Sequence, residues 1–202
     1  MILNRVAHLA PVAALASAGL WAPGAMAAPE PLLVPTRDVT VQYQVVPTGH
    51  APVLVDVAVK AGGMRLRITS DMLPTTLLVN RDTEKAAIML PMLRAYSDIK
   101  IGRFDPTNTV LKGASFTQGG RERVADHDCT VWRAASAEGT AEACITPDGV
   151  ILRGAVENEK RGKQVTLTAT RVAFGPVPDA DFMVPPDFQR SPFKLGVDGL
   201  GK

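Results

Sequence analysis

The sequence lacks the features that mark membrane spans, nucleic-acid binding and polybasic anchors. After the N-terminal segment it has no run of about 18 apolar residues, so no later stretch could cross a bilayer as a helix. Its 22 Lys and Arg residues exceed its 20 Asp and Glu residues by only two, and the cations do not cluster. We therefore expect no nucleic-acid partner and no stable membrane anchor.

Aromatic residues and histidine are scarce, and catalytic motifs are missing. Only 5% of the residues are aromatic, and the chain has three His. Neither the G-x-S-x-G nucleophile motif nor the H-E-x-x-H metal motif occurs. His127 and Cys129 could suggest a metal site, but alternation puts Asp126 and Asp128 on the opposite face of that stretch. We therefore expect no enzyme, no metal site and no cofactor.

The chain does contain a hydrophobic core and an export signal. Its 202 residues are 46% hydrophobic and 21% charged, the balance of one globular domain. Residues 1–27 have the pattern of a secretory signal peptide, with Arg5 before an apolar stretch and a small-residue cleavage site at Ala25-Met26-Ala27. An uncleaved anchor is the alternative, but the stretch is short for one. The residue directly after the cleavage site is Ala28 rather than the Cys that a lipoprotein requires, so we predict a periplasmic protein that is not a lipoprotein.

The two cysteines, Cys129 and Cys144, favour a structural disulfide. An even cysteine count in an exported protein points to pairing. Both lie in strand-like stretches that turn residues separate. We expect an antiparallel hairpin with Cys129 directly opposite Cys144, and with Arg133 and Glu142 as diagonal neighbours able to form an ion pair. A redox-active pair is the alternative, but the close C-x-x-C spacing is absent.

Alternation of apolar and polar residues, typical of half-buried strands, dominates the chain. It predicts strands within residues 39–45, 53–59, 64–69 and 77–90, the last interrupted by a turn at residues 80–83. After Pro91, apolar residues recur at helical spacing as far as Tyr96 and predict one short helix. Residues 104–112 are predicted as a loop.

The second half of the chain is predicted as a meander of strands. A turn is expected at Gly119-Gly120, and a β-bulge near Thr170 or Arg171, where the apolar parity of the last strand shifts. Beyond this strand the chain is rich in Gly and Pro. Its apolar side chains available for docking are Phe182, Val184 and Phe188.

Three stretches of the chain form a set that resembles a known family. They are GRERVADHDCTVW from Gly120 to Trp132, CITPDGVILR from Cys144 to Arg153, and FMVPPDF from Phe182 to Phe188. The set resembles uncharacterised exported bacterial domains related to the LolA/LolB lipoprotein carriers. One departure is Asp126, where the relatives more often carry Gly.

The resemblance covers about residues 37–188 and implies a mainly β (α+β) fold. Expected is a curved antiparallel sheet that forms an incomplete, LolA-like barrel with one or few short helices. In the carriers, the apolar concave face of this shape holds lipoprotein acyl chains. The chain would divide into a signal peptide at 1–27, an N-terminal linker at 28–36, a half-barrel domain at 37–188 and a flexible tail at 189–202.

The leading hypothesis is a binding protein that accommodates a lipid, an acyl chain, another hydrophobic ligand or a lipidated protein segment in its concave face. The candidate lining residues are apolar positions of the first strands: Val41, Tyr43, Val55, Val57, Met64, Leu66, Ile68, Leu77, Val79, Ile88 and Leu90. Plain core packing is the alternative role for each. For the whole protein, the alternative is a structural or protein-interaction module of the cell envelope with a filled core. The sequence leaves the oligomeric state open.

Overall fold

The structure, a computed structural model, describes residues 30–72, 74–100, 114–137, 139–158 and 162–191. The predicted signal peptide and the loop predicted at 104–112 lie outside the described residues. Among the described residues, no helix has both the length and the apolar character needed to span a membrane.

Twelve strands form one sheet, and the helical elements described between them are single turns of 3-10 helix. The strands are β1 (Val39–Pro47), β2 (Val53–Val59), β3 (Arg65–Ser70), β4 (Thr75–Asn80), β5 (Lys85–Leu90), β6 (Ala95–Lys100), β7 (Ser115–Val124), β8 (His127–Ser136), β9 (Gly139–Ile145), β10 (Ile151–Asn158), β11 (Gly162–Phe174) and β12 (Gln189–Arg190). The 3-10 turns are η1 (Ala61–Gly63), η2 (Pro91–Leu93) and η4 (Asp179–Phe182).

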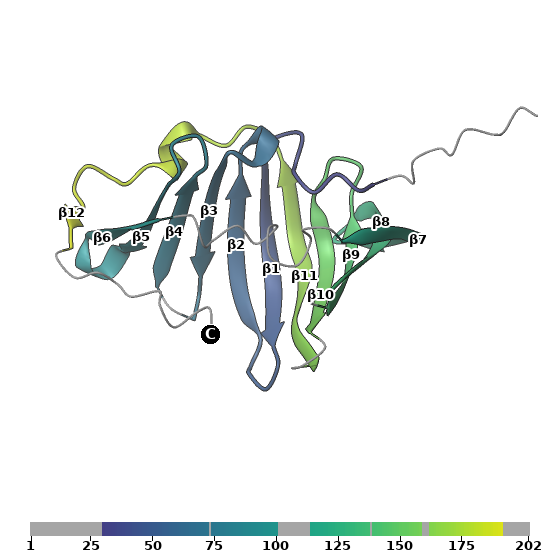
Figure 1. The fold of residues 1–202 in the computed structure, drawn as a ribbon. Coiled ribbons are helices and arrows are strands. Elements are labelled where there is room, and N and C mark those ends of the chain that lie inside the picture. The colour runs from purple at the N-terminus through teal and green to yellow at the C-terminus, as the bar shows by residue number, and fades with distance from the viewer. Residues whose placement is uncertain (1–29, 73, 101–113, 138, 159–161, 192–202) are drawn as a thin grey trace, which may run out of the picture.

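The sheet is built outward from its middle. Its order is β12-β6-β5-β4-β3-β2-β1-β11-β10-β9-β8-β7, and all neighbours are antiparallel except β12 and β6 (Figure 1). Strands β1 to β6 follow one another toward one edge, and β7 to β11 return from the other edge to pair with β1. Consecutive strands β6 and β7 therefore lie at opposite ends of the sheet.

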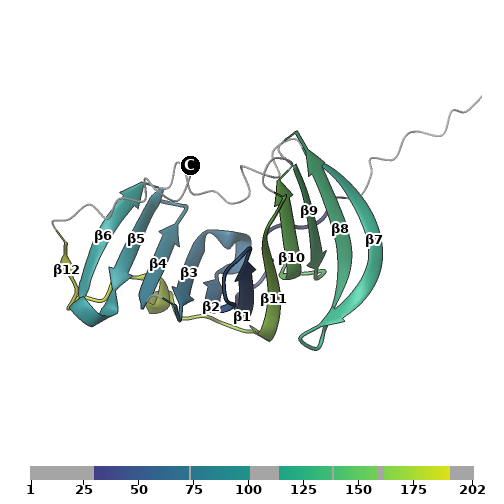
Figure 2. The same ribbon diagram turned by 90° about the horizontal axis from the view of Figure 1, so that it is seen from below.

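The sheet is strongly bowed and does not close. Seen along its strands, it curves away on both sides of β1 and β2, and the edges at β7 and β12 stay apart (Figure 2). This confirms the predicted fold class, a mainly β structure whose antiparallel sheet forms an incomplete barrel.

Strand pairing follows the alternation of the sequence. Val41 lies opposite Val57 on β2 and opposite Val172 on β11, so apolar residues of neighbouring strands share one face. The predicted bulge is confirmed: Gln42 pairs with Arg171 while Tyr43 pairs with Ala169, which leaves Thr170 as the extra residue.

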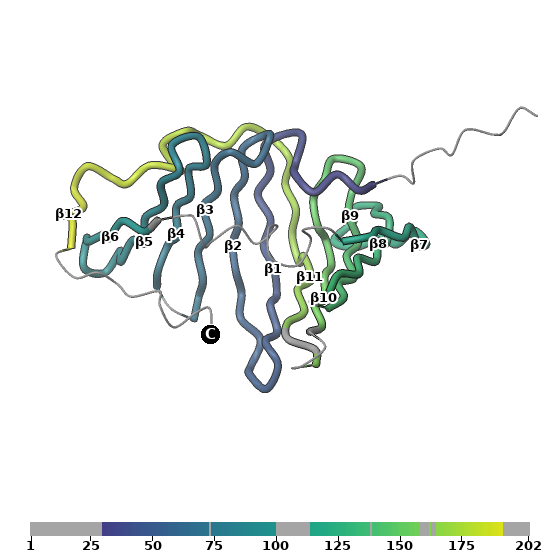
Figure 3. Tube along the Cα trace, viewed as in Figure 1, coloured from purple at the N-terminus to yellow at the C-terminus, as the bar shows by residue number. Residues whose placement is uncertain are grey.

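The helix predicted after Pro91 is wrong. Only the single turn η2 forms, and Arg94 ends it with a positive φ of 45°. The chain then reverses, so Tyr96 lies in β6 opposite Met89 of β5. Pairing with β5 outweighs the helical spacing of a few apolar residues, because it satisfies a whole row of backbone groups. The Cα trace shows this reversal at one end of the sheet (Figure 3).

The turn predicted at Gly119-Gly120 is also wrong, because β7 runs through both glycines. Gln118 pairs with Trp132 and Arg121 with Thr130, so the two glycines face the single residue Val131 of β8. The two glycines therefore form a bulge inside a long strand.

The disulfide between Cys129 and Cys144 is confirmed, with a Cα–Cα distance of 5.3 Å. The predicted register is wrong by two residues, since Val131 rather than Cys129 lies directly opposite Cys144. Pairing continues to a tight turn between Ser136 and Gly139, and that turn sets the register.

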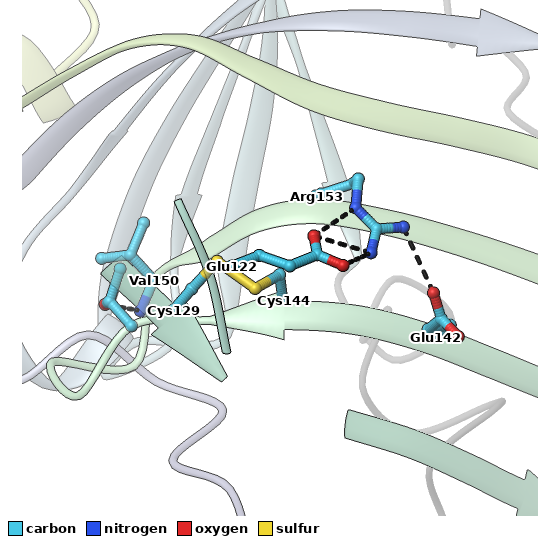
Figure 4. The surroundings of a disulfide bond; sticks show 7 residues. Glu122, Cys129, Glu142, Cys144, Val150 and Arg153 are labelled. Carbon is cyan, nitrogen blue, oxygen red and sulfur yellow. Dashed lines mark hydrogen bonds and ion pairs between the residues drawn. A yellow bond between two sulfur atoms is a disulfide. The ribbon is translucent and has the colours of Figure 1, made fainter. Parts of the chain in front are cut away.

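Charged side chains surround this hairpin. Arg133 lies directly opposite Glu142, and their side chains pair at 3.0 Å. Beside the disulfide, the Arg153 guanidinium of β10 pairs with Glu142 at 3.2 Å and with Glu122 of β7 at 2.8 Å (Figure 4). The outermost strand β7 is thereby tied to β10 by side chains as well as by the sheet.

Candidate functional site: the apolar inner face

The segment after β11 identifies the two faces of the sheet. It runs along the outer side of the bow (Figure 2), where Val177 and Phe182 bury themselves against Ala58 of β2. Phe182, one of the predicted docking residues, therefore packs on the outer face, and Val184 and Phe188 are half-buried. Residues of opposite parity to Ala58, such as Val57, face the inner side of the bow.

The inner face carries continuous apolar rows. Five adjacent strands contribute one directly opposed residue each to the first row: Val41, Val57, Ile68, Leu77 and Ile88. Because adjacent strands lie about 4.8 Å apart, this row spans roughly 19 Å.

A second row on the same face runs parallel to the first. It consists of Val39, Val59, Leu66, Val79 and Ala86. Tyr43 and Val55 pair beside the first row, on its other side. Most of the second row is buried, and its residues Val39 and Val59, together with Val41, pack in one core cluster with Cys129, Val131 and Cys144. The accessible part of the face is therefore the half-buried first row from Val57 to Ile88.

The structure thus brings the predicted lining residues together, with one exception. Met64 lies outside the strands, at the end of η1, and is 40% exposed. Of the others, Val41 and Val79 are buried, while the rest are half-buried: Tyr43, Val55, Val57, Leu66, Ile68, Leu77, Ile88 and Leu90. A sheet face with half-buried apolar side chains has surface left to bury against a ligand.

Tyr43 is fixed within this face. Its hydroxyl donates a hydrogen bond of 2.7 Å to the carbonyl oxygen of Ile151 on β10, so its ring lies across β11. Burial of the phenol raises the pKa of Tyr43 well above its ordinary value. Tyr43 is therefore a rigid neutral part of the inner wall.

Several residues of the inner face were not among the predicted lining residues. Beyond β1, Val172 and Leu167 of β11 continue the face, opposite Val41 and Val45. Their alternation was visible, but only the pairing of β1 with β11 shows that they share this face. On β6, the buried Ser97 lies opposite Ile88 and places a hydroxyl near one end of the row.

The outer face contains a cleft of about 250 Å³. Side chains from β2, β3 and β11 line it, among them Asp56, Arg67 and Arg171, and Asp181 of η4 closes one side at 3.8 Å from Arg67. The charged side chains of this cleft therefore lie on the face opposite the apolar rows.

Asp38 anchors the C-terminal segment to the outer face. Its carboxylate accepts hydrogen bonds from the backbone N–H of Val177 at 3.0 Å and of Ala61 at 2.9 Å, and pairs with Lys60 at 3.0 Å. These contacts, the bond from Val177 first, hold the pKa of Asp38 at about 2, below its ordinary value. Lys60 also pairs with Asp179 of η4 at 3.1 Å.

No family model and no curated protein matches the sequence. Solved structures are similar at low identity. An uncharacterised conserved protein from Thermus thermophilus is 12% identical over 77% of this chain and 90% of that chain, with a TM-score of 0.56. The MucA/MucB complex of Pseudomonas aeruginosa matches with 16% identity over 75% of this chain and a TM-score of 0.53. A LolA superfamily protein from Nitrosomonas europaea is 11% identical over 75% of this chain and 92% of that chain, with a TM-score of 0.40.

The unclosed, bowed sheet with an apolar inner face is the shape that the sequence resemblance implied. The fold is LolA-like. At these identities the likenesses concern the fold alone. This chain spans 57% of the matched chain of the MucA/MucB complex, so the LolA-like sheet corresponds to part of that protein.

Proposed function

We propose that the protein is an exported, non-enzymatic binding protein that holds an acyl chain or another hydrophobic ligand on the inner face of its LolA-like sheet. The ligand is a lipid or a lipidated protein segment. The observation that carries the proposal is the row from Val41 to Ile88, which places aliphatic side chains of five adjacent strands on one face.

The physical basis is burial of hydrocarbon. Each methylene that leaves water contributes about 0.8 kcal/mol, so a chain laid along the half-buried residues from Val57 to Ile88, a span of roughly 14 Å, is held without any polar contact. Charged side chains such as Arg67 and Asp56 lie on the outer face and do not interrupt the row. The Tyr43 hydroxyl is hydrogen-bonded to the Ile151 carbonyl oxygen, so only its ring would contact a ligand.

Export is supported by the disulfide and by the signal-peptide pattern. A disulfide such as Cys129–Cys144 persists in oxidising compartments outside the cytoplasm. The LolA-like fold, which the sequence resemblance links to periplasmic carriers, agrees with this location. The proposed location is the periplasm.

The proposal is tested on protein purified from its own periplasm. Native mass spectrometry and organic extraction should find a bound lipid, and a hydrophobic fluorescent probe such as N-phenyl-1-naphthylamine should bind to the stripped protein and compete with fatty acid. If no lipid co-purifies with the protein and the stripped protein does not bind the probe, the proposal is wrong.

Matched variants locate the binding. Ile68→Asn and Leu77→Asn change half-buried inner-face residues and should weaken probe binding about tenfold, the loss expected for one buried aliphatic side chain. Leu54→Asn makes the same kind of change on β2, at an outward position that is 40% exposed, and should leave binding unchanged. Circular dichroism confirms that each variant is folded. If all three variants weakened probe binding equally, the probe would not bind specifically to the inner face.

A second candidate is a protein-interaction module of the cell envelope. The likeness to the MucA/MucB complex favours it, because a protein partner accompanies that fold there. Crosslinking in the periplasm, followed by mass spectrometry, separates the candidates. Attachment of one protein segment to the inner face in lipid-free protein supports this second function, and bound lipid supports the first.

A further inference from the structure

Strand β7 (Ser115–Val124) is a free edge of the sheet. It pairs with β8 on one side, and the sheet ends on its other side. Among the described residues, nothing outside β8 forms a hydrogen bond with the backbone of β7. Ten residues of extended chain therefore present open N–H and C=O groups on one side, which is a template for another strand.

The two edges of the sheet differ in whether another strand covers them. At the opposite edge, Gln189 and Arg190 of β12 pair with β6 and cover part of it. Proteins protect edges with short strands, charges, bulges or covering segments. Strand β7 has a bulge and three charged residues but no covering segment among the described residues, so any strand that pairs with it must fit these charges and the bulge.

The sequence of β7 complements itself around its bulge. Ser115 to Gln118 is uncharged, while Arg121, Glu122 and Arg123 carry all the charges of the strand. Gly119 and Gly120 separate the halves. An antiparallel copy related by a two-fold axis at the two glycines would place the charged half of each strand beside the uncharged half of the other.

In that alignment the opposed residues fit. Gln118 faces Arg121 of the second copy, Thr117 faces its Glu122, and Phe116 faces its Arg123. Because the bulge reverses the alternation, Gln118 and Arg121 point to the same side of β7, so opposed residues share a face. Amide, hydroxyl and aromatic groups thus meet charged residues. Of these, Glu122 also pairs with Arg153 and Arg123 with Asp128 of their own chain, and Arg123 can stack on Phe116 of the second copy.

Other alignments are penalised. Pairing centred on Glu122 would set Glu122 against itself and Arg121 against Arg123. The like charges thereby disfavour the alignment about Glu122, whereas in the alignment about the glycines no like charges oppose one another.

We propose that β7 is a dimerisation edge that pairs antiparallel with β7 of a second copy about the Gly119-Gly120 bulge, joining two sheets into one continuous sheet. The interface is isologous, so each side-chain pair occurs twice. The dimer leaves the inner face of each sheet accessible.

The test is sedimentation equilibrium of the purified protein over a range of concentrations, with two pairs of charge variants. Gln118→Glu and Thr117→Arg each create two opposite-charge pairs and should tighten the dimer roughly fivefold, since two cross-strand pairs of about 0.5 kcal/mol each add about 1 kcal/mol. Gln118→Lys and Thr117→Glu create like-charge pairs and should weaken it by a similar factor. Both side chains are exposed, so folding should be unaffected.

The same charge change has opposite expected effects at the two positions, which controls for net charge. A negative charge strengthens the dimer at 118 and weakens it at 117. If the dissociation constant of the dimer depended only on the net charge of the variant, or did not change in any of the four variants, the proposed alignment would be wrong.

Crosslinking gives an independent readout. A Cβ at Gly120 meets no atom within 4 Å, and among the described residues there is no free cysteine, so Gly120→Cys adds one reactive thiol. A short bifunctional maleimide should crosslink two copies through this residue. Gln44→Cys, at an exposed position of the central strand β1, should give no dimer. A protein that is monomeric at every concentration and shows no difference between the two cysteines would refute the proposal.

Discussion

Tyr43 of β1 and Ile151 of β10 are joined across the strand that separates them. The phenol hydroxyl donates to the Ile151 carbonyl oxygen at 2.7 Å, which lies where β10 begins and its ladder with β9 shifts register. One side chain therefore satisfies a carbonyl that the irregular ladder leaves for it, and it ties the two halves of the sheet together.

Tyr43→Phe should lower the free energy of unfolding by about 1 kcal/mol, because the Ile151 carbonyl loses its partner while the ring is kept. Urea unfolding measures the change. Tyr96→Phe is the matched control at the only other tyrosine, whose hydroxyl has no hydrogen bond among the described residues. Equal losses in both variants would show that the bond from Tyr43 contributes nothing specific.

Asp38→Asn should destabilise the protein at pH 7 by about 1 kcal/mol, because it removes the charge that Val177, Ala61 and Lys60 stabilise. The folded pKa of about 2 is below the unfolded value, so this stability is present above about pH 4 and is lost as the pH falls toward 2. Unfolding curves of wild type and variant should therefore converge between these pH values.

Asp56→Asn is the control for this pH dependence, since the Asp56 carboxylate accepts one hydrogen bond from Gln42 and has no ion pair among the described contacts. Its effect should be small at every pH. A difference between wild type and Asp38→Asn that is as large at pH 2 as at pH 7 would contradict the linkage.

Replacing Cys129 and Cys144 together by Ser should cost about 3 kcal/mol, the chain-entropy value for a loop with a sequence separation of 15. Thermal and urea unfolding measure the loss, and reduction of the wild-type protein should reproduce it. Alkylation of denatured, unreduced protein should label neither cysteine. Labelling of both would mean that the pair is reduced in the native protein.

Gly149→Ala should destabilise the protein by about 3 kcal/mol or more. Its φ is +83°, and a Cβ would clash with the carbonyl oxygen of Val34, so backbone strain and a clash add together. Gly62→Ala isolates the first contribution, because its φ is +76° but a Cβ meets nothing within 4 Å. It should cost only about 1 kcal/mol. Equal costs would rule out the close approach of Val34.

The local features of the fold could be predicted from the sequence because they depend on neighbouring residues. Alternation located the strands, and the parity shift located the bulge at Thr170. The Cys hairpin register was missed because it depends on the tight turn at Ser136 and Gly139, and a disulfide also forms between residues that are diagonal in the ladder. The strand at Tyr96 was missed because its partner Met89 decides it.

The candidate site was predictable in its composition but not in its extent. Alternation alone assigned Val57 and Ile68 to one face, and the ladders show that they are opposed. The continuation through Val172 required the pairing of the first strand with the eleventh, which residues far apart in the sequence determine. The free edge at β7 has no local signal, because it depends on where the sheet ends.

The central claim, that the inner face binds hydrocarbon, is tested most directly by methyl NMR of selectively labelled protein titrated with a fatty acid. The methyl resonances of Ile68, Leu77 and Ile88 should shift together and saturate, while those of Leu54 and Leu78 on the outer face stay in place. Unchanged inner-face resonances, or shifts confined to the outer face, would contradict the account.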